Sequence, residues 1–178
     1  MKICALVLIF AMTAAALPAE TPPRGSPPKP PVAASKPERA DRLLVEKAAR
    51  KMTLFAGSET LRSYRIALGR QPVGDKQCQG DCRTPEGFYV IDSRNPKSQY
   101  HRSLHVSYPS PADVADANKR GCAPGGAICI HGLPNGFGYL GPVHTLSDWT
   151  LGCIAVTDQE IEEIWKLVPN GTPIEIRP

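Results

Sequence analysis

The chain has 178 residues and a formal net charge of +4, a length that suits one folded domain of ~100–200 residues with extensions. The charge suits contact with an anionic surface, but no run of clustered lysine and arginine residues indicates a nucleic-acid-binding protein. Composition therefore excludes little beyond nucleic-acid binding.

The N-terminal segment predicts export. Lys2 precedes an apolar stretch, residues 3–16, that is too short to span a bilayer comfortably as a mature helix. Small residues that suit signal-peptidase cleavage lie at Ala14, Ala16 and Ala19. We expect residues 1–19 to be a signal peptide, with an uncleaved membrane anchor as the alternative. Eight prolines between residues 18 and 37 make residues 20–40 an extended spacer before a domain over 41–178.

The folded part has the pattern of a mostly β protein. Residues 39–52 have helical propensity, but two short apolar runs separated by a charged link fit two strands equally well. Alternation of apolar residues predicts a strand that ends at Gly69. The expected strands cover residues 61–68, 87–91, 104–108, 127–131 and 172–176.

One helix near the C-terminus has clear boundary signals. Thr157 and Glu160 form a capping-box pattern, and a Pro-Asn-Gly sequence at 169–171 ends the helix. Its apolar stripe consists of Ile161, Ile164, Leu167 and Val168. A second, short helix is expected over residues 111–119.

The cysteines divide into paired and unpaired candidates. Cys4 lies in the signal segment, and five cysteines remain for an oxidising compartment. Four of them lie in or beside Gly-rich turns and are candidates for two disulfides: Cys78, Cys82, Cys122 and Cys129. Pairing within each turn is the simplest connectivity, and bridging between the turns is the alternative. Cys153 is left over, as an intermolecular link or a reactive thiol. The cysteine spacings are a poor zinc pattern, so no metal site is predicted.

The segment from Ile130 to Val156 concentrates the residues that suit thiol chemistry. A catalytic thiol needs a base and backbone N–H groups that stabilise an oxyanion. Gly152 allows a tight turn beside Cys153, and His131 is the best base because it ends a predicted strand next to a glycine. A buried, inert cysteine is the alternative.

These residues resemble a known signature. His131-Gly132, followed by Thr-x-Gly-Cys-Ile at 150–154, resembles the L,D-transpeptidase catalytic domain of the YkuD type. Arg-Thr-Pro-Glu-Gly-Phe-Tyr at 83–89 is similar to the Thr-Pro-x-Gly-x-Tyr stretch of that domain. The resemblance spans residues 42–178, and residues 148–156 are similar to a Gram-negative periplasmic branch. It implies a mainly β fold, a sandwich or barrel with one late α-helix and with the cysteine and histidine at one end.

The resemblance assigns roles residue by residue. Cys153 matches the acylated nucleophile, His131 matches its base, and Gly132 matches the residue whose carbonyl orients that histidine. Four further residues are expected to bind substrate or orient the site: Asp148, His144, Thr150 and Gly152. The commonest family signature has histidine and arginine where this chain has Leu151 and Ala155, a difference that bears on substrate orientation and on the acceptor.

The implied reaction is attack of Cys153 on an amide of a peptidoglycan stem peptide, after the L-centre of its diamino acid. The thioester then passes to an amine. One alternative is an L,D-carboxypeptidase or endopeptidase that hydrolyses stem peptides or releases wall-attached protein, and a second is a non-catalytic peptidoglycan-binding module. No cofactor is implied. The expected partners are stem peptides and a wall-attached lipoprotein, in the periplasm, with membrane contact only if the signal segment is uncleaved.

Overall fold

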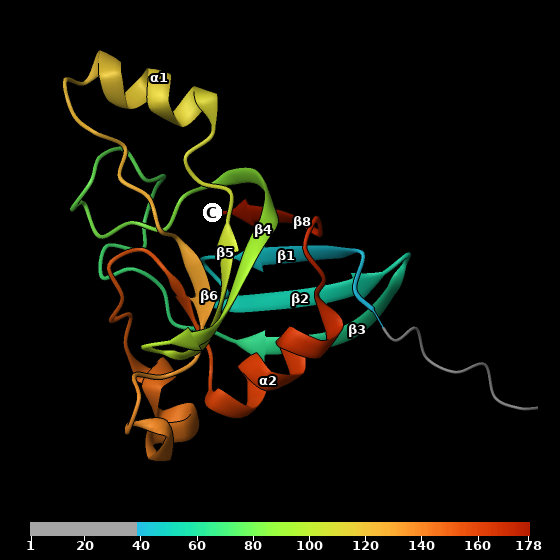
Figure 1. Cartoon of the computed structure of the whole chain (residues 1–178). Coiled ribbons are helices and arrows are strands. Elements are labelled where there is room, and N and C mark those ends of the chain that lie inside the picture. The colour runs from blue at the N-terminus through green and yellow to red at the C-terminus, as the bar shows by residue number, and fades with distance from the viewer. Residues whose placement is uncertain (1–38) are drawn as a thin grey trace, which may run out of the picture. The chain divides into compact units, whose positions relative to one another are not determined.

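An eight-stranded, curved sheet organises residues 39–178, which are the residues that the computed structural model describes (Figure 1). The expected signal peptide and nearly all of the proline-rich spacer lie outside the described residues. The strand order is β3-β2-β1-β8-β4-β5-β6-β7. The strands are β1 (Arg42–Glu46), β2 (Lys51–Ala56), β3 (Glu59–Arg65), β4 (Gly87–Ser98), β5 (His101–Val106), β6 (Cys129–His131), β7 (Ile154–Ala155) and β8 (Pro173–Arg177).

The first two strands settle the ambiguous segment at 39–52. β1 pairs antiparallel with β2 and parallel with β8, so each of its backbone edges has a partner. Leu43 and Val45 alternate onto the buried face, and Met52 and Leu54 join them from β2. Tertiary pairing therefore overrides the helical propensity of this segment.

Strand β4 joins the two halves of the sheet. Its first residues, 87–90, pair with β8, and residues 91–98 pair with β5. The register shifts after Ile91 and again after Asn95, and such bulges bend a strand and increase its twist. The sheet therefore curls at β4, which brings its two edges toward each other.

The two edges of the sheet meet at a seam. Ala67, just beyond β3, exchanges two backbone hydrogen bonds with Ala155 of β7, with N–O distances of 3.0 and 2.8 Å. A second bridge joins Gly69 to Thr150. We call these contacts of residues 67–69 with residues 150–155 the barrel seam. They confirm the expectation of a mainly β, barrel-like fold.

Three helical segments accompany the sheet. Helix α2 (Asp158–Leu167) has the expected capping box of Thr157 and Glu160, and it packs against β5 and β6 (Figure 1). Helix α1 (Pro111–Lys119) was also expected. The 3₁₀ segment η1 (Gly138–Leu146) was not predicted. Among residues 39–178, no helix is long and apolar enough to cross a membrane.

The loop between β3 and β4 is anchored by a buried lysine. Lys47 is 1% exposed, and its ammonium group donates to the carboxylate of Glu86 at 2.8 Å and to the carbonyl oxygen of Thr84 at 2.9 Å. A buried charge requires such partners. The ion pair holds the motif at residues 83–89 against the sheet.

Candidate active site

Cys153 lies at the barrel seam, immediately before β7. The short strand β7 runs parallel to β6, with Ile154 opposite Ile130 and Ala155 opposite His131. This register makes Cys129 the neighbour of Cys153 on the adjacent strand, and the Cys129 backbone N–H donates to Cys153 Sγ at 3.4 Å. The strand pairing therefore brings the predicted nucleophile and the predicted base to the same end of the sheet.

The turn that precedes Cys153 is held by Thr150 and requires glycine. The Thr150 hydroxyl donates to the Cys153 carbonyl oxygen at 2.8 Å and accepts from the Gly152 N–H at 3.1 Å. Gly152 has a φ of +136°, and a Cβ there would lie 2.7 Å from the carbonyl oxygen of Arg83. Such a conformation is unfavourable for residues with a side chain. The Thr-x-Gly-Cys pattern thus encodes the local geometry of the nucleophile.

His131 is held in one tautomer. It is 4% exposed, and its Nδ1 lies 2.7 Å from the Gly132 carbonyl oxygen. A carbonyl oxygen only accepts, so Nδ1 carries the proton, and Nε2 is the nitrogen that can take a proton from substrate or thiol. Tyr100 and Trp149 pack on the ring, with centroid distances of 4.4 and 5.7 Å. The imidazole is therefore fixed in both orientation and tautomer.

The surroundings of Cys153 stabilise its thiolate. The Cys129 thiol donates a hydrogen bond to Cys153 Sγ, and this contact is the largest influence on the Cys153 pKa. Burial opposes ionisation, but the hydrogen bond and charge of His131 and the Cys129 backbone N–H reinforce it, and the pKa of Cys153 falls to about 4. The same thiol–thiol contact, together with burial, raises the pKa of Cys129. Reactive cysteines have lowered pKa values of this kind.

A pocket of about 600 Å³ opens onto the thiol. Its lining combines the predicted residues Cys153, His131 and Thr150 with Leu151, noted above as a departure from the family signature, and with residues that the sequence did not assign to the site. The complete lining is Arg70, Tyr100, Gly126, Ala127, Ile128, His131, Trp149, Thr150, Leu151 and Cys153. Arg70 comes shortly after the predicted strand 61–68. Its position beside Gly69 is the one feature of the sequence that could have indicated a place in the site.

Four predicted site residues are absent from this lining: Gly152, whose place in the turn is described above, and Asp148, His144 and Gly132. Asp148 pairs with Arg50 at 2.7 Å and accepts from the Leu68 N–H at 2.9 Å, which favours its turn-orienting role over binding of an amine. His144 is buried and lines a neighbouring apolar pocket of about 280 Å³, and burial lowers its pKa. Gly132 contributes its carbonyl to His131, and a Cβ there would lie 2.7 Å from a carboxylate oxygen of Asp158.

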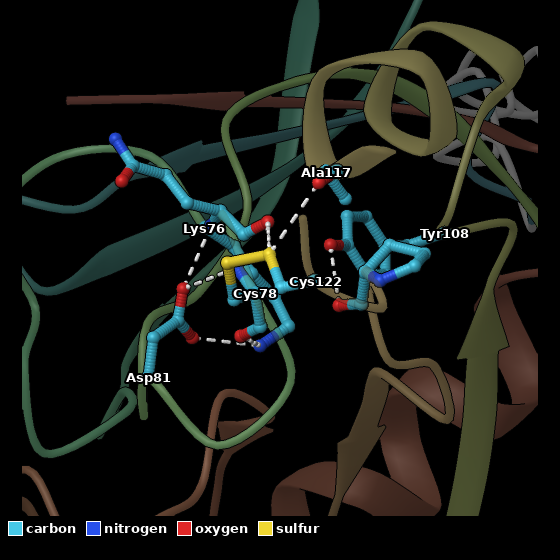
Figure 2. The surroundings of a disulfide bond; sticks show 8 residues. Lys76, Cys78, Asp81, Tyr108, Ala117 and Cys122 are labelled. Carbon is cyan, nitrogen blue, oxygen red and sulfur yellow. Dashed lines mark hydrogen bonds and ion pairs between the residues drawn. A yellow bond between two sulfur atoms is a disulfide. The ribbon is translucent and has the colours of Figure 1, made fainter. Parts of the chain in front are cut away.

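The disulfide expectation needs correction. Cys78 bonds to Cys122, across the two turns (Figure 2). Cys82 and Cys129 are free thiols. Pairing within each turn is therefore wrong. Asp81 stabilises the turn that contains Cys78 and Cys82. Its carboxylate accepts hydrogen bonds from the Gln77, Cys78 and Arg83 N–H groups and pairs with Lys76. Burial opposes ionisation of Asp81, but these bonds outweigh it and lower its pKa to about 2.

Figure 2 shows the disulfide joining the Asp81 turn to the chain that follows helix α1. Cys129 cannot join this arrangement because it begins β6 beside Cys153. Cys153 is consequently one of three free cysteines among the described residues, and its partner-free state does not by itself mark it as the nucleophile. Its contacts with Cys129 and His131 do.

Comparisons with known proteins agree with this geometry. The YkuD family profile, described as the L,D-transpeptidase catalytic domain, matches residues 40–176. YafK of Escherichia coli K12 is 30% identical over 115 residues, which are 64% of this chain and 39% of YafK. The chain thus spans well under half of that curated relative.

Solved structures show the same fold. The helical cell shape determining protein Pgp2 of Campylobacter jejuni is similar with a TM-score of 0.57 and 23% identity, over 78% of this chain and 47% of that one. Bd1075 of Bdellovibrio bacteriovorus gives a TM-score of 0.53 and 26% identity over 78% and 48%. An L,D-transpeptidase of Mycobacterium smegmatis gives 0.52 and 14% over 78% and 59%. The profile match over most of the chain, on a fold that places Cys153 and His131 in one pocket, means that the chain belongs to the L,D-transpeptidase catalytic domain family.

Proposed function

We propose that this chain is a cysteine L,D-transpeptidase that acts on peptidoglycan stem peptides, with Cys153 as nucleophile and His131 as its base. One observation carries the proposal: a thiol with a pKa of about 4 shares a pocket with a histidine whose Nδ1–H is fixed on the Gly132 carbonyl. Membership of the family supports the reaction class.

The reaction has two steps. His131 Nε2 takes the proton of the Cys153 thiol. The thiolate attacks the carbonyl carbon of the amide after the L-centre of the diamino acid, the C–N bond breaks, and the leaving amine takes that proton from Nε2. His131 then removes a proton from the acceptor amine, which attacks the thioester, and the C–S bond breaks to restore the thiolate. Thr150 orients the Gly152–Cys153 turn so that substrate can approach the thiol.

Export of the chain is part of the proposal. The signal-like segment at residues 1–19 and the spacer at 20–40 would deliver a domain over 41–178 to the periplasm. The Cys78–Cys122 disulfide supports an oxidising compartment. A wall-attached lipoprotein is a second acceptor or product that the same thioester chemistry could serve.

Incubation of the purified chain with disaccharide tetrapeptides tests the proposal. Transpeptidation predicts crosslinked dimers by mass spectrometry, whereas hydrolysis would give only trimmed stems. Cys153→Ala should abolish either product, and Cys82→Ala, which removes a free thiol outside the catalytic pocket, should retain it. Peptidoglycan binding without turnover by the wild type would indicate a binding module instead. A covalent carbapenem adduct on Cys153, seen by intact mass, gives an independent measure of the acyl-accepting thiol.

A further inference from the structure

The catalytic pocket contains one permanently charged side chain. Its ten lining residues include no aspartate or glutamate, and Arg70 is the only lysine or arginine among them. His131 is the other group that can carry positive charge. Apart from the Cys153 thiolate itself, the lining holds no anionic group, and Arg70 favours an anionic ligand beside the nucleophile.

Arg70 is held in place by the segment that leads to the nucleophile. Its backbone N–H donates to the Thr150 carbonyl oxygen at 3.0 Å, and its Nε–H donates to the Trp149 carbonyl oxygen at 3.2 Å. These bonds leave the two terminal amino groups of the guanidinium available. Arg50 differs, because its guanidinium is occupied by Asp148. Within residues 39–178, no carboxylate pairs with Arg70.

Arg70 supplies a positive charge that position 155 of this chain lacks. Ala155, where the commonest family signature places arginine, is fully buried and bonds to Ala67 across the seam. Alanine at this position supplies no cation to the pocket. Arg70, three residues after Ala67 on the opposite edge, lies at the surface and lines the pocket.

We propose that Arg70 determines donor specificity by binding a carboxylate of the stem peptide, an inference that rests on the proposed function. A guanidinium group matches a carboxylate with two parallel hydrogen bonds. Two carboxylates of the donor have this chemistry: the terminal one, on the residue released by the reaction, and the one on the second centre of diaminopimelate. One of them binds the guanidinium while the scissile amide lies at Cys153, and the test below distinguishes the two.

Three donor peptides separate these sources. The first is the tetrapeptide acid with diaminopimelate, the second its C-terminal carboxamide, and the third the acid with lysine in place of diaminopimelate. Wild-type kcat/KM should fall about 10- to 100-fold for whichever peptide lacks the bound carboxylate, the range expected of a charged hydrogen bond. The loss should lie mainly in KM.

Arg70→Gln should lower kcat/KM for the full acid by a similar factor and abolish the discrimination between the acid and the peptide that lacks the bound carboxylate. Arg70→Lys should restore part of the activity, because lysine keeps the positive charge but cannot donate two parallel hydrogen bonds to a carboxylate. Arg65→Gln, which removes an exposed arginine of β3 outside the pocket, is the matched control. Alkylation of Cys153 by neutral iodoacetamide should be unchanged in Arg70→Gln, which reports an intact pocket.

Two results would overturn the inference while the proposed function stands. One is wild-type turnover that is indifferent to both carboxylate deletions. The other is an Arg70→Gln enzyme that keeps full discrimination, or loses activity equally on all three peptides. Absence of wild-type turnover on every peptide would instead overturn the proposed function together with this inference.

Discussion

Replacement of Cys129 by alanine tests how the nucleophile is activated. Cys129→Ala removes the thiol that donates to Cys153 Sγ but keeps the backbone N–H contact. Loss of a donor destabilises the thiolate, so the pKa of Cys153 should rise. The expected rise is from about 4 to roughly 5–6, because a hydrogen bond to a charged group contributes about 1.5–3 kcal/mol and one pKa unit corresponds to about 1.36 kcal/mol.

The rate of carbamidomethylation of Cys153 as a function of pH measures this change. Peptide mass spectrometry assigns the label to Cys153, and far-UV circular dichroism at each pH confirms that the protein is folded. The midpoint of the rate should move up in Cys129→Ala. The plateau above the midpoint should also rise about 3- to 10-fold, because intrinsic thiolate nucleophilicity increases with pKa with a Brønsted coefficient of ~0.4–0.5.

Cys82→Ala is the matched control, since it removes a free thiol that does not line the catalytic pocket. It should change neither the midpoint nor the plateau. The reasoning would be refuted by a Cys129→Ala protein with the wild-type midpoint, because Cys129 would then not be the donor that stabilises the thiolate. A lowered midpoint would refute it equally.

Three further substitutions test the supports of the site. Gly152→Ala should lower the free energy of unfolding by ~1–3 kcal/mol and slow carbapenem acylation, because its Cβ would lie 2.7 Å from a backbone carbonyl oxygen. The control is Gly126→Ala, which has open space for a Cβ and should unfold in urea like wild type. A fully active, stable Gly152→Ala would contradict the geometry. Asp81→Asn should cost ~1–3 kcal/mol at neutral pH. The Asp81 pKa of about 2 lies below its unfolded value near 3.9, so this difference is present above pH ~4 and should shrink as the pH falls toward 2; urea titrations with equal differences at both ends would contradict it. The double variant Cys78→Ser, Cys122→Ser should lose about 4 kcal/mol of free energy of unfolding by the loop-entropy estimate for a separation of 44 residues. Wild-type protein in dithiothreitol should fall to the same thermal midpoint as this variant. An unchanged midpoint would show that the disulfide does not constrain the fold.

Local signals predicted the elements whose boundaries depend on local chemistry. The capping box of Thr157 and Glu160 and the closing Pro-Asn-Gly sequence located helix α2 to within a residue at each end. The strands expected at residues 87–91, 104–108, 127–131 and 172–176 correspond to β4, β5, β6 and β8. Strand β4 continues to Ser98, seven residues past its predicted end, because exposed polar residues in a bulged hairpin have no apolar alternation.

Features that depend on long-range approach could not be predicted. Strand β7 has two residues and exists only through its pairing with β6 and the seam. The Cys78–Cys122 bond depends on two loops meeting in space, and turn composition does not encode that meeting. Arg70 has no local signal beyond its position after the predicted strand, because the seam that brings it to the pocket of Cys153 depends on residues distant in sequence.

The seam also orders the assembly of the site during folding. Cys129 and Cys153 are 24 residues apart in the chain, whereas the contacts of Asp148 with Leu68 and Arg50 join residues 80 and 98 positions apart. Closing longer loops costs more entropy, and contacts distant in sequence form more slowly. The two thiols can therefore approach each other before the barrel closes. The side of the catalytic pocket that contains Arg70 forms only when the barrel closes. In refolding experiments, alkylation of Cys153 should recover its native rate before turnover of peptide substrates returns.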